Sequence, residues 1–106
     1  MTDKIFLQTT CATIEEAERI ARHLVDRRLA ACASISAPVR SIYRWRGAVE
    51  DAQEYVLTVK TRRDLFERVG AAIRTVHSYE TPELIALPVV AGSAEYLEWM
   101  DRELAP

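Results

Sequence analysis

Apolar residues along the chain follow two spacings, one of every second residue and one of every third or fourth residue. The first spacing occurs in short runs rich in β-branched residues and predicts strands at residues 5–10, 31–36, 42–46, 53–61 and 84–90. The second predicts three amphipathic helices, whose buried faces carry Ile14, Ala17, Ile20, Ala21, Leu24 and Val25, then Leu65, Val69, Ala72, Ile73 and Val76, and finally Tyr96, Leu97, Met100 and Leu104. The order β-α-β-β-α-β followed by a helix indicates one α+β domain of ferredoxin-like type over residues 1–106.

Polar residues mark where the predicted helices begin. Thr13 and Glu16 have the spacing of a capping box, in which Thr13 accepts a hydrogen bond from the Glu16 amide and the Glu16 carboxylate reaches back to the helix start. Residues 61–64 are a second helix start, and residues 92–93, Gly-Ser, cap the last helix. Each predicted helix therefore has a start signal of its own.

Residues 31–61 are predicted to form a long, bent β-hairpin. Pro38 breaks or bulges its first arm, because proline cannot donate a hydrogen bond to a neighbouring strand. Gly47 and the polar pair Glu50-Asp51 are expected to make the turn. Both arms exceed the roughly five to six residues typical of strands in globular domains, so the tip extends beyond the part of the sheet that two helices can cover.

Tyr43 and Trp45 share one face of this extension, because side chains two residues apart in a strand point the same way. Large exposed aromatic patches usually mark interfaces. We therefore expect another copy of the chain to pack on the extension. The alternative is that the terminal helix folds back and covers it.

Composition and charge exclude several classes of protein. Apolar residues make up 49% and charged residues 28% of the chain, and the net charge of −2 argues against the basic stripe of a nucleic-acid-binding protein. No apolar run approaches the roughly 20 residues of a membrane span, so we expect no membrane association through such a segment. The first residues show no signal-peptide pattern, which predicts a cytoplasmic protein in which Cys11 and Cys32 are free thiols.

Four motifs in order resemble the CutA divalent-cation tolerance family. They are Leu29-Ala30-Ala31-Cys32, Ser41-Ile42-Tyr43-Arg44-Trp45-Arg46-Gly47, Lys60-Thr61, and His77-Ser78-Tyr79-Glu80-Thr81-Pro82-Glu83-Leu84. The similarity spans nearly the whole chain. It implies a ferredoxin-like fold and a compact homotrimer built from extended hairpins, similar in shape to the PII signalling proteins. It also implies an association with copper and divalent-cation tolerance, and it brings no established catalytic reaction.

The resemblance points to Cys32 and His77 as candidate metal ligands for copper or another divalent cation. A thiolate favours Cu(I), and an imidazole suits Cu(II) or zinc. In some relatives a further cysteine aligns with Thr9, whereas in this chain Cys11 lies two residues on, roughly 7 Å along a strand. The alternative for Cys32 is a small buried hydrophobic residue in a strand.

A second candidate site is a cleft between subunits that binds a small molecule. Its residues, Tyr43, Trp45, Lys60, Tyr79 and Glu83, combine aromatic walls with a few polar groups. The alternative is that the aromatic residues anchor an interface and that Lys60 and Glu83 form a structural ion pair.

Two other functions fit the same fold but not these residues. An acylphosphatase-like enzyme needs an anion-binding loop after the first strand, and residues 9–13 contain neither glycine nor arginine. An RNA-binding sheet needs stacking aromatics and a basic surface, and residues 55–60 of this acidic chain offer Tyr55 alone. We therefore expect a non-enzymatic metal-binding trimer, or alternatively a trimer that binds a small molecule or a partner and has no metal site.

Overall fold

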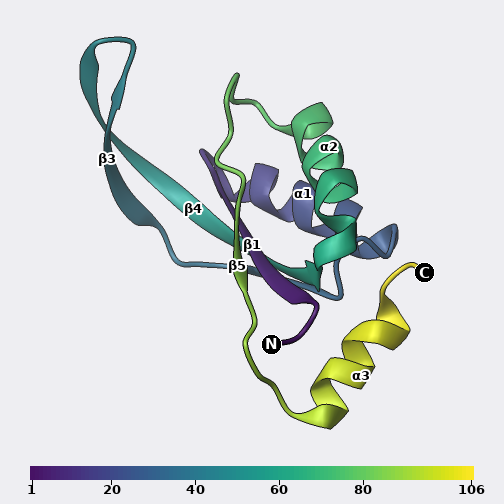
Figure 1. The fold of residues 1–106 in the computed structure, drawn as a ribbon. Helices are drawn as coiled ribbons and strands as arrows, with labels where there is room; N and C mark the ends of the chain where they lie inside the picture. Colours follow the sequence, from purple (N-terminus) through teal and green to yellow (C-terminus); the bar gives the residue numbers. More distant parts are fainter.

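The computed structural model describes residues 1–106, and Figure 1 shows how its elements are arranged. The elements are β1 (Lys4–Cys11), α1 (Ile14–Asp26), β2 (Cys32–Ile35), β3 (Val39–Trp45), β4 (Ala48–Arg62), a 3₁₀ turn (Arg63–Leu65), α2 (Phe66–Val76), β5 (Ile85–Pro88) and α3 (Ala94–Glu103). The sheet is antiparallel in the order β2-β4-β1-β5, with β3 paired to the outer part of β4. The predicted α+β fold with ferredoxin-like element order is confirmed.

One face of the sheet is covered by α1 and α2, and the opposite face is open in the single chain (Figure 1). Alternate residues of β1 and β4 point toward the helices, and Leu7, Leu57 and Val59 are fully buried there. They pack against the apolar faces of α1 and α2, including Ile20 and Ile73. Each such side chain contributes about 1.5–3 kcal/mol through burial, so the helices are held chiefly by this layer.

The start of α1 only half matches the predicted capping box. The Glu16 backbone N–H donates to Thr13 Oγ1 at 3.1 Å, as expected for the capping residue. The Glu16 carboxylate does not return to the helix start; instead it accepts a hydrogen bond from Ser78 N at 2.8 Å. The expectation for this side chain is wrong, because burial against the loop after α2 offers it a partner far away in sequence.

The hairpin of residues 31–61 is long and bent and turns at Gly47 as predicted, but its turn is tighter than expected. Pairing runs to Trp45 opposite Ala48, so the turn contains only residues 46–47, with positive φ angles of 50° and 83°. Two such residues match the twist of the strands in a tight hairpin turn. Glu50 and Asp51 are therefore strand residues, opposite Tyr43 and Ile42, and the prediction that they form the turn is wrong.

The break in the first arm lies at residues 36–38, which separate β2 from β3 as the proline predicted. Ser36 keeps the two arms together, because its N–H donates to Val56 O and its hydroxyl accepts from Val56 N, both at 2.9 Å. Beyond this point β3 and the outer half of β4, residues 39–54, project from the domain and are called the ribbon below (Figure 1). The molecule measures 45 × 25 × 24 Å as a result.

The last strand and helix complete the domain at the end away from the ribbon. β5 pairs with β1 alone, so Pro88 lies on an edge strand, where a residue without an N–H is tolerated. Ser93 caps α3 by accepting a hydrogen bond from Tyr96 N at 3.3 Å, and Met100 of α3 is buried. Figure 1 places α3 far from the ribbon, so the terminal helix does not cover Trp45 within the chain. None of the helices is long and apolar enough to span a bilayer.

Candidate functional site

The two residues proposed as metal ligands from the sequence lie in different parts of the molecule. Cys32 is half-buried on β2 opposite Lys60, and its Sγ lies 3.8 Å from Ser34 Oγ. His77 follows α2, and its ring contacts Thr10 near the other end of the sheet. Lys60 pairs with Phe6, four residues before Thr10, so the two candidate ligands are separated by roughly 13 Å along β1. A single chain does not bring them together.

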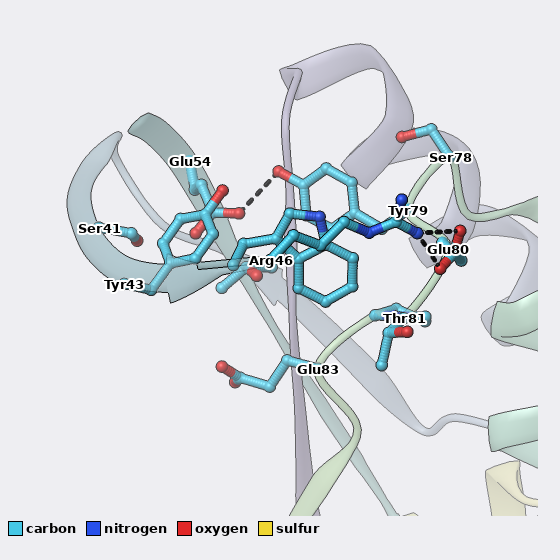
Figure 2. Close-up of a pocket in the computed structure, with 12 residues that line it drawn as sticks. Ser41, Tyr43, Arg46, Glu54, Ser78, Tyr79, Glu80, Thr81 and Glu83 are labelled. Atoms are coloured by element: carbon cyan, nitrogen blue, oxygen red, sulfur yellow. Dashed lines mark hydrogen bonds and ion pairs between the residues drawn. The ribbon is translucent and has the colours of Figure 1, made fainter. Parts of the chain in front are cut away.

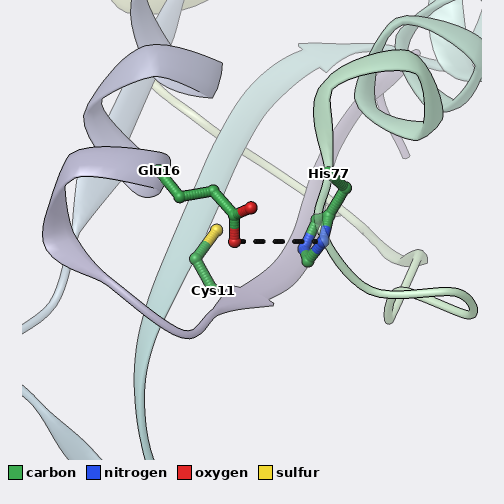
Figure 3. Close-up of side chains that lie close together, drawn as sticks. All are labelled: Cys11, Glu16 and His77. Atoms are coloured by element: carbon green, nitrogen blue, oxygen red, sulfur yellow. Dashed lines mark ion pairs between the residues drawn. The ribbon is translucent and has the colours of Figure 1, made fainter.

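His77 instead lies beside Cys11 and Glu16, and the three side chains offer metal-ligating atoms within 4.8 Å of one another (Figure 3). Cys11 ends β1, Glu16 is in the first turn of α1, and His77 follows α2. The side chains of all three are almost wholly excluded from solvent. We call these residues the Cys-Glu-His cluster.

The His77 ring is fixed in one tautomer by its hydrogen bonds. Its Nδ1 accepts from Tyr79 N at 3.0 Å, so this nitrogen carries no proton. Its Nε2 therefore carries the proton and donates to the Thr10 carbonyl at 2.8 Å. Nδ1 is also the nitrogen that faces Glu16, with Oε1 4.0 Å away. The Nδ1 lone pair is thus occupied by the Tyr79 N–H beside the cluster, and the ring is oriented from behind by a backbone carbonyl.

One oxygen of Glu16 has no partner in the chain. Oε2 accepts from Ser78 N, whereas Oε1 is buried and accepts no hydrogen bond. Leaving a buried polar atom unpaired costs about 1–3 kcal/mol, and more for a charged group. This oxygen is therefore the atom of the cluster that most needs a further partner.

Cys11 is a protonated thiol in the protein without bound ions. Burial, followed by the nearby charges of Glu16 and Glu54, raises its pKa from 9.0 to about 12. A thiol in this state is a poor nucleophile. The cluster therefore has no activated cysteine, and a positive ion would be needed to stabilise the thiolate.

A separate pocket of about 710 Å³ lies on the open face of the sheet, between the ribbon and the loop of residues 78–83 (Figure 2). It is lined by Thr10, Ser41, Tyr43, Trp45, Arg46, Glu54, Ser78, Tyr79, Glu80, Thr81, Pro82 and Glu83. Tyr79 OH donates to Glu54 Oε2 at 2.7 Å. Burial and then this carboxylate raise the pKa of Tyr79, so the phenol remains a neutral donor.

An ion pair joins the two walls of this pocket. Arg46 Nη2, at the ribbon turn, donates to both carboxylate oxygens of Glu80 at 2.6 and 2.8 Å. The guanidinium also lies 5.3 Å from the centroid of the Trp45 ring. Both charged side chains are about two-thirds exposed, so the pair contributes little to stability but spans the mouth of the pocket.

The structure brings four of the five predicted ligand-binding residues to this pocket, namely Tyr43, Trp45, Tyr79 and Glu83. Lys60 lies outside it, six residues and roughly 20 Å along β4 from Glu54. Its Nζ is 3.4 Å from Tyr96 OH and 5.6 Å from the Phe6 ring centroid.

The ion pair suggested between Lys60 and Glu83 is absent, because Glu83 Oε2 accepts from Gln8 Nε2 at 2.9 Å instead. The sequence did not indicate that Glu54 lines a pocket, because its place in a strand of alternating polarity is typical of a solvent-exposed residue.

Comparison with known proteins assigns the chain to a family. The model of the CutA1 divalent ion tolerance protein family matches residues 5–103. The divalent-cation tolerance protein CutA of Archaeoglobus fulgidus is 42% identical over 97 residues, which are 92% of this chain and 94% of that protein. The corresponding protein of Thermus thermophilus is 43% identical over 91 residues, 86% of this chain and 88% of that protein.

Solved structures of this family have the same fold. CutA from Xylella fastidiosa superposes with a TM-score of 0.94 at 36% identity, covering 98% of this chain and all of that one. The A. fulgidus structure, described as a periplasmic divalent cation tolerance protein, gives a TM-score of 0.91 at 40% identity over 94% of this chain and 97% of that one. The match of sequence and fold over nearly the full length agrees with the motifs around Cys32, Trp45 and His77. The chain therefore belongs to the CutA1 divalent-ion tolerance family.

Proposed function

We propose that this protein is a homotrimer that binds a copper- or zinc-type cation through Cys11, Glu16 and His77, and that it acts in the response to metal ions without catalysing a reaction. The observation that carries the proposal is the buried Glu16 Oε1, which accepts no hydrogen bond and lies 4.0 Å from His77 Nδ1. The family description, divalent ion tolerance, names a response to cations and no reaction.

The donor set suits a transition-metal ion of intermediate softness. Thiolate sulfur, imidazole nitrogen and carboxylate oxygen are all ligands of zinc and copper. The Thr10 carbonyl that holds His77 Nε2–H is the kind of outer partner that orients metal-bound histidines. Thiolate and carboxylate together would carry two negative charges, which a divalent cation neutralises. A bound cation would therefore give Glu16 Oε1 a partner and neutralise the charges of both ligands.

Binding would require two small local changes. Ligand atoms around a tetrahedral ion with bonds of about 2.0–2.3 Å lie roughly 3.3–3.8 Å apart, so the separation of up to 4.8 Å must shorten by about 1 Å. His77 Nδ1 must also release the Tyr79 N–H. Because the Cys11 thiol is protonated without an ion, binding would release its proton and strengthen as pH rises.

A metal titration with matched cysteine variants tests this centre. Reduced protein is titrated with Cu(I) and with Zn²⁺ against a chromophoric chelator, using the wild type, Cys11→Ser and Cys32→Ser. We expect Cys11→Ser to weaken binding at least tenfold and Cys32→Ser to leave it unchanged. Glu16→Gln, which retains an acceptor for Ser78 N, should also weaken binding and serves as a second variant for the same centre.

Two results would contradict the proposal in different ways. Loss of binding in Cys32→Ser alone would favour a site at Cys32, assembled between chains. Absence of binding to the wild type would leave the alternative of a trimer that binds a small molecule or partner.

Exposed apolar surface supports the proposed assembly. On the open face of the sheet, Phe6, Ile85 and Leu87 are 38%, 50% and 59% exposed, and Trp45 on the ribbon is 41% exposed. β5 is also an unprotected edge strand, which natural proteins usually cover. Packing of further copies would bury the open face of the sheet and the edge of β5, and the sequence resemblance implies three. Light scattering at low micromolar concentration should give three chains per particle, and a monomer would contradict the assembly.

A cytoplasmic location remains part of the proposal. The A. fulgidus relative is described as periplasmic, and a relative from Arabidopsis thaliana as chloroplastic, so family members differ in location. Fractionation of cells that produce the full-length protein would test this part.

A further inference from the structure

We propose that the pocket between the ribbon and the loop of residues 78–83 binds a small organic ammonium ion, with its charge between Glu54 and Glu83 and its apolar part against Tyr43 and Trp45. Two of its lining residues, Ser78 and Tyr79, donate backbone hydrogen bonds to Glu16 and His77. None of the cluster residues lines the pocket itself, and the inference requires no bound metal ion. It goes beyond the proposed function by adding a second ligand of a different chemical class.

Glu54 is the first reason to expect a cationic ligand. The residue is only 5% exposed, although it carries a carboxylate. The single hydrogen bond to its carboxylate within the chain comes from the neutral Tyr79 hydroxyl, at 2.7 Å to Oε2. None of the ion pairs of the chain includes it. Buried carboxylates are normally paired with a cation, and within the chain Glu54 has no such partner.

The other charged residues of the pocket also favour a cationic ligand. Its lining contains three glutamates, Glu54, Glu80 and Glu83, and one basic residue, Arg46. Arg46 is already bound to Glu80 and lies against the Trp45 ring, so it offers nothing to a second anion. Glu83 receives a hydrogen bond only from the neutral side chain of Gln8. Two carboxylates are therefore left for a ligand, and an anionic ligand would be repelled.

The walls favour an organic cation over a metal ion. Tyr43, Trp45 and Glu54 all line the pocket, so an ammonium ion bound there would meet both a negative charge and aromatic rings (Figure 2). The volume of about 710 Å³ is in the range of about 300–1,000 Å³ that holds small organic ligands. The single group of three metal-ligating side chains in the chain is the Cys-Glu-His cluster, and it includes no residue of this pocket's lining.

Tyr79 fixes the geometry of the acceptor. In the protein without a bound metal ion, its backbone N–H donates to His77 Nδ1 and its hydroxyl donates to one oxygen of Glu54. The other oxygen, Oε1, accepts no hydrogen bond from the chain and remains available to a ligand. The pocket thus has an oriented carboxylate at its base before any ligand arrives, which lowers the cost of binding.

Three probes of similar shape and different charge test the inference on the assembled protein. Benzylamine, benzyl alcohol and benzoate are titrated by calorimetry and by ligand-observed NMR at neutral pH, where benzylamine is an ammonium ion. We expect benzylamine to bind at least tenfold more tightly than benzyl alcohol, and benzoate not to bind. Equal binding of the alcohol, tighter binding of benzoate, or no binding of benzylamine would each overturn the inference.

Variants locate the charge that is responsible. Glu54→Gln keeps the shape and the acceptor for Tyr79, and it should weaken benzylamine binding at least tenfold. Glu50→Gln is the matched control, because Glu50 lies on the same face of β4 outside the pocket lining, and it should bind as the wild type does. If Glu54→Gln disturbs the fold, Glu83→Gln on the loop should still weaken binding severalfold. Unchanged affinity in both pocket variants would overturn the inference.

Discussion

Replacing Tyr79 by phenylalanine removes one oxygen atom and tests whether Glu54 is a buried charge with a single donor. The hydroxyl supplies the only hydrogen bond that the Glu54 carboxylate receives in the chain, at 2.7 Å, and Glu54 is 5% exposed. A hydrogen bond to a charged group contributes about 1.5–3 kcal/mol, so Tyr79→Phe should lower the free energy of unfolding by about that amount.

A double-mutant cycle isolates the charge from other effects of the substitution. With Glu54→Gln in the background the same hydrogen bond is neutral and contributes only about 1 kcal/mol, so the two changes should be coupled by roughly 0.5–2 kcal/mol. Urea unfolding of the four proteins at equal concentration measures both quantities. Equal concentration is needed because assembly also contributes to the stability of each protein.

Tyr55→Phe is the matched control for this cycle. Tyr55 is a partly buried tyrosine on β4 that packs against the core, and its hydroxyl has no hydrogen-bond partner in the chain. The control should change stability by less than about 0.5 kcal/mol. If Tyr79→Phe costs no more than this control, or costs the same with glutamate and glutamine at position 54, the account of Glu54 is refuted.

Three further changes test other parts of the structure. In the folded protein the Cys11 thiol has a pKa of about 12, whereas an unfolded thiol loses its proton near pH 9. The free energy of unfolding should therefore fall as the pH rises from 9 to 12, and Cys11→Ser should reduce this pH dependence in urea titrations. The Lys4 side chain is 4% exposed, and its Nζ lies 3.1 Å from Asp101 Oδ1 of α3. Asp101→Asn should therefore lower the free energy of unfolding by about 1 kcal/mol and speed amide hydrogen exchange in α3, and unaltered exchange would contradict a role of this ion pair in holding α3. Gly47 has a φ of +83° with open space around it, so Gly47→Ala should cost about 1 kcal/mol from backbone strain alone, and a neutral or stabilising effect in thermal unfolding would contradict the turn geometry.

The fold could be predicted from local sequence patterns, and the prediction of the hairpin turn went wrong where two patterns favoured different structures. The helices over residues 14–26 and 66–76 and the central strands were predicted because one buried face repeats at a fixed spacing. The hairpin turn was predicted at Gly47 but made too long, because Glu50 and Asp51 have the polarity of a turn, whereas an exposed ribbon tolerates charged residues in its strands. The tight turn at Arg46-Gly47 instead depends on two positive φ angles, for which only the glycine gives a signal.

The candidate sites were less predictable because they depend on contacts between distant segments. His77 was proposed as a ligand, but its neighbours Cys11 and Glu16 lie more than sixty residues earlier in the chain, and only the packing of α1 beside α2 brings them together. Glu16 was explained completely by its helix-capping position. Four of the five predicted ligand-binding residues line the pocket, and all four lie in motifs of the family. Glu54 lies outside those motifs and is buried by a loop whose path the sequence does not specify.

The most direct test of the metal centre is to locate the ion itself. Crystals of the reduced, assembled protein grown with Cu or Zn²⁺ would be measured at the absorption edge of the metal, so that anomalous density identifies its position. The account predicts one peak per chain within about 2.0–2.3 Å of Cys11 Sγ, His77 Nδ1 and Glu16 Oε1. Peaks at Cys32, or none near His77 in protein shown to have bound the metal, would contradict it.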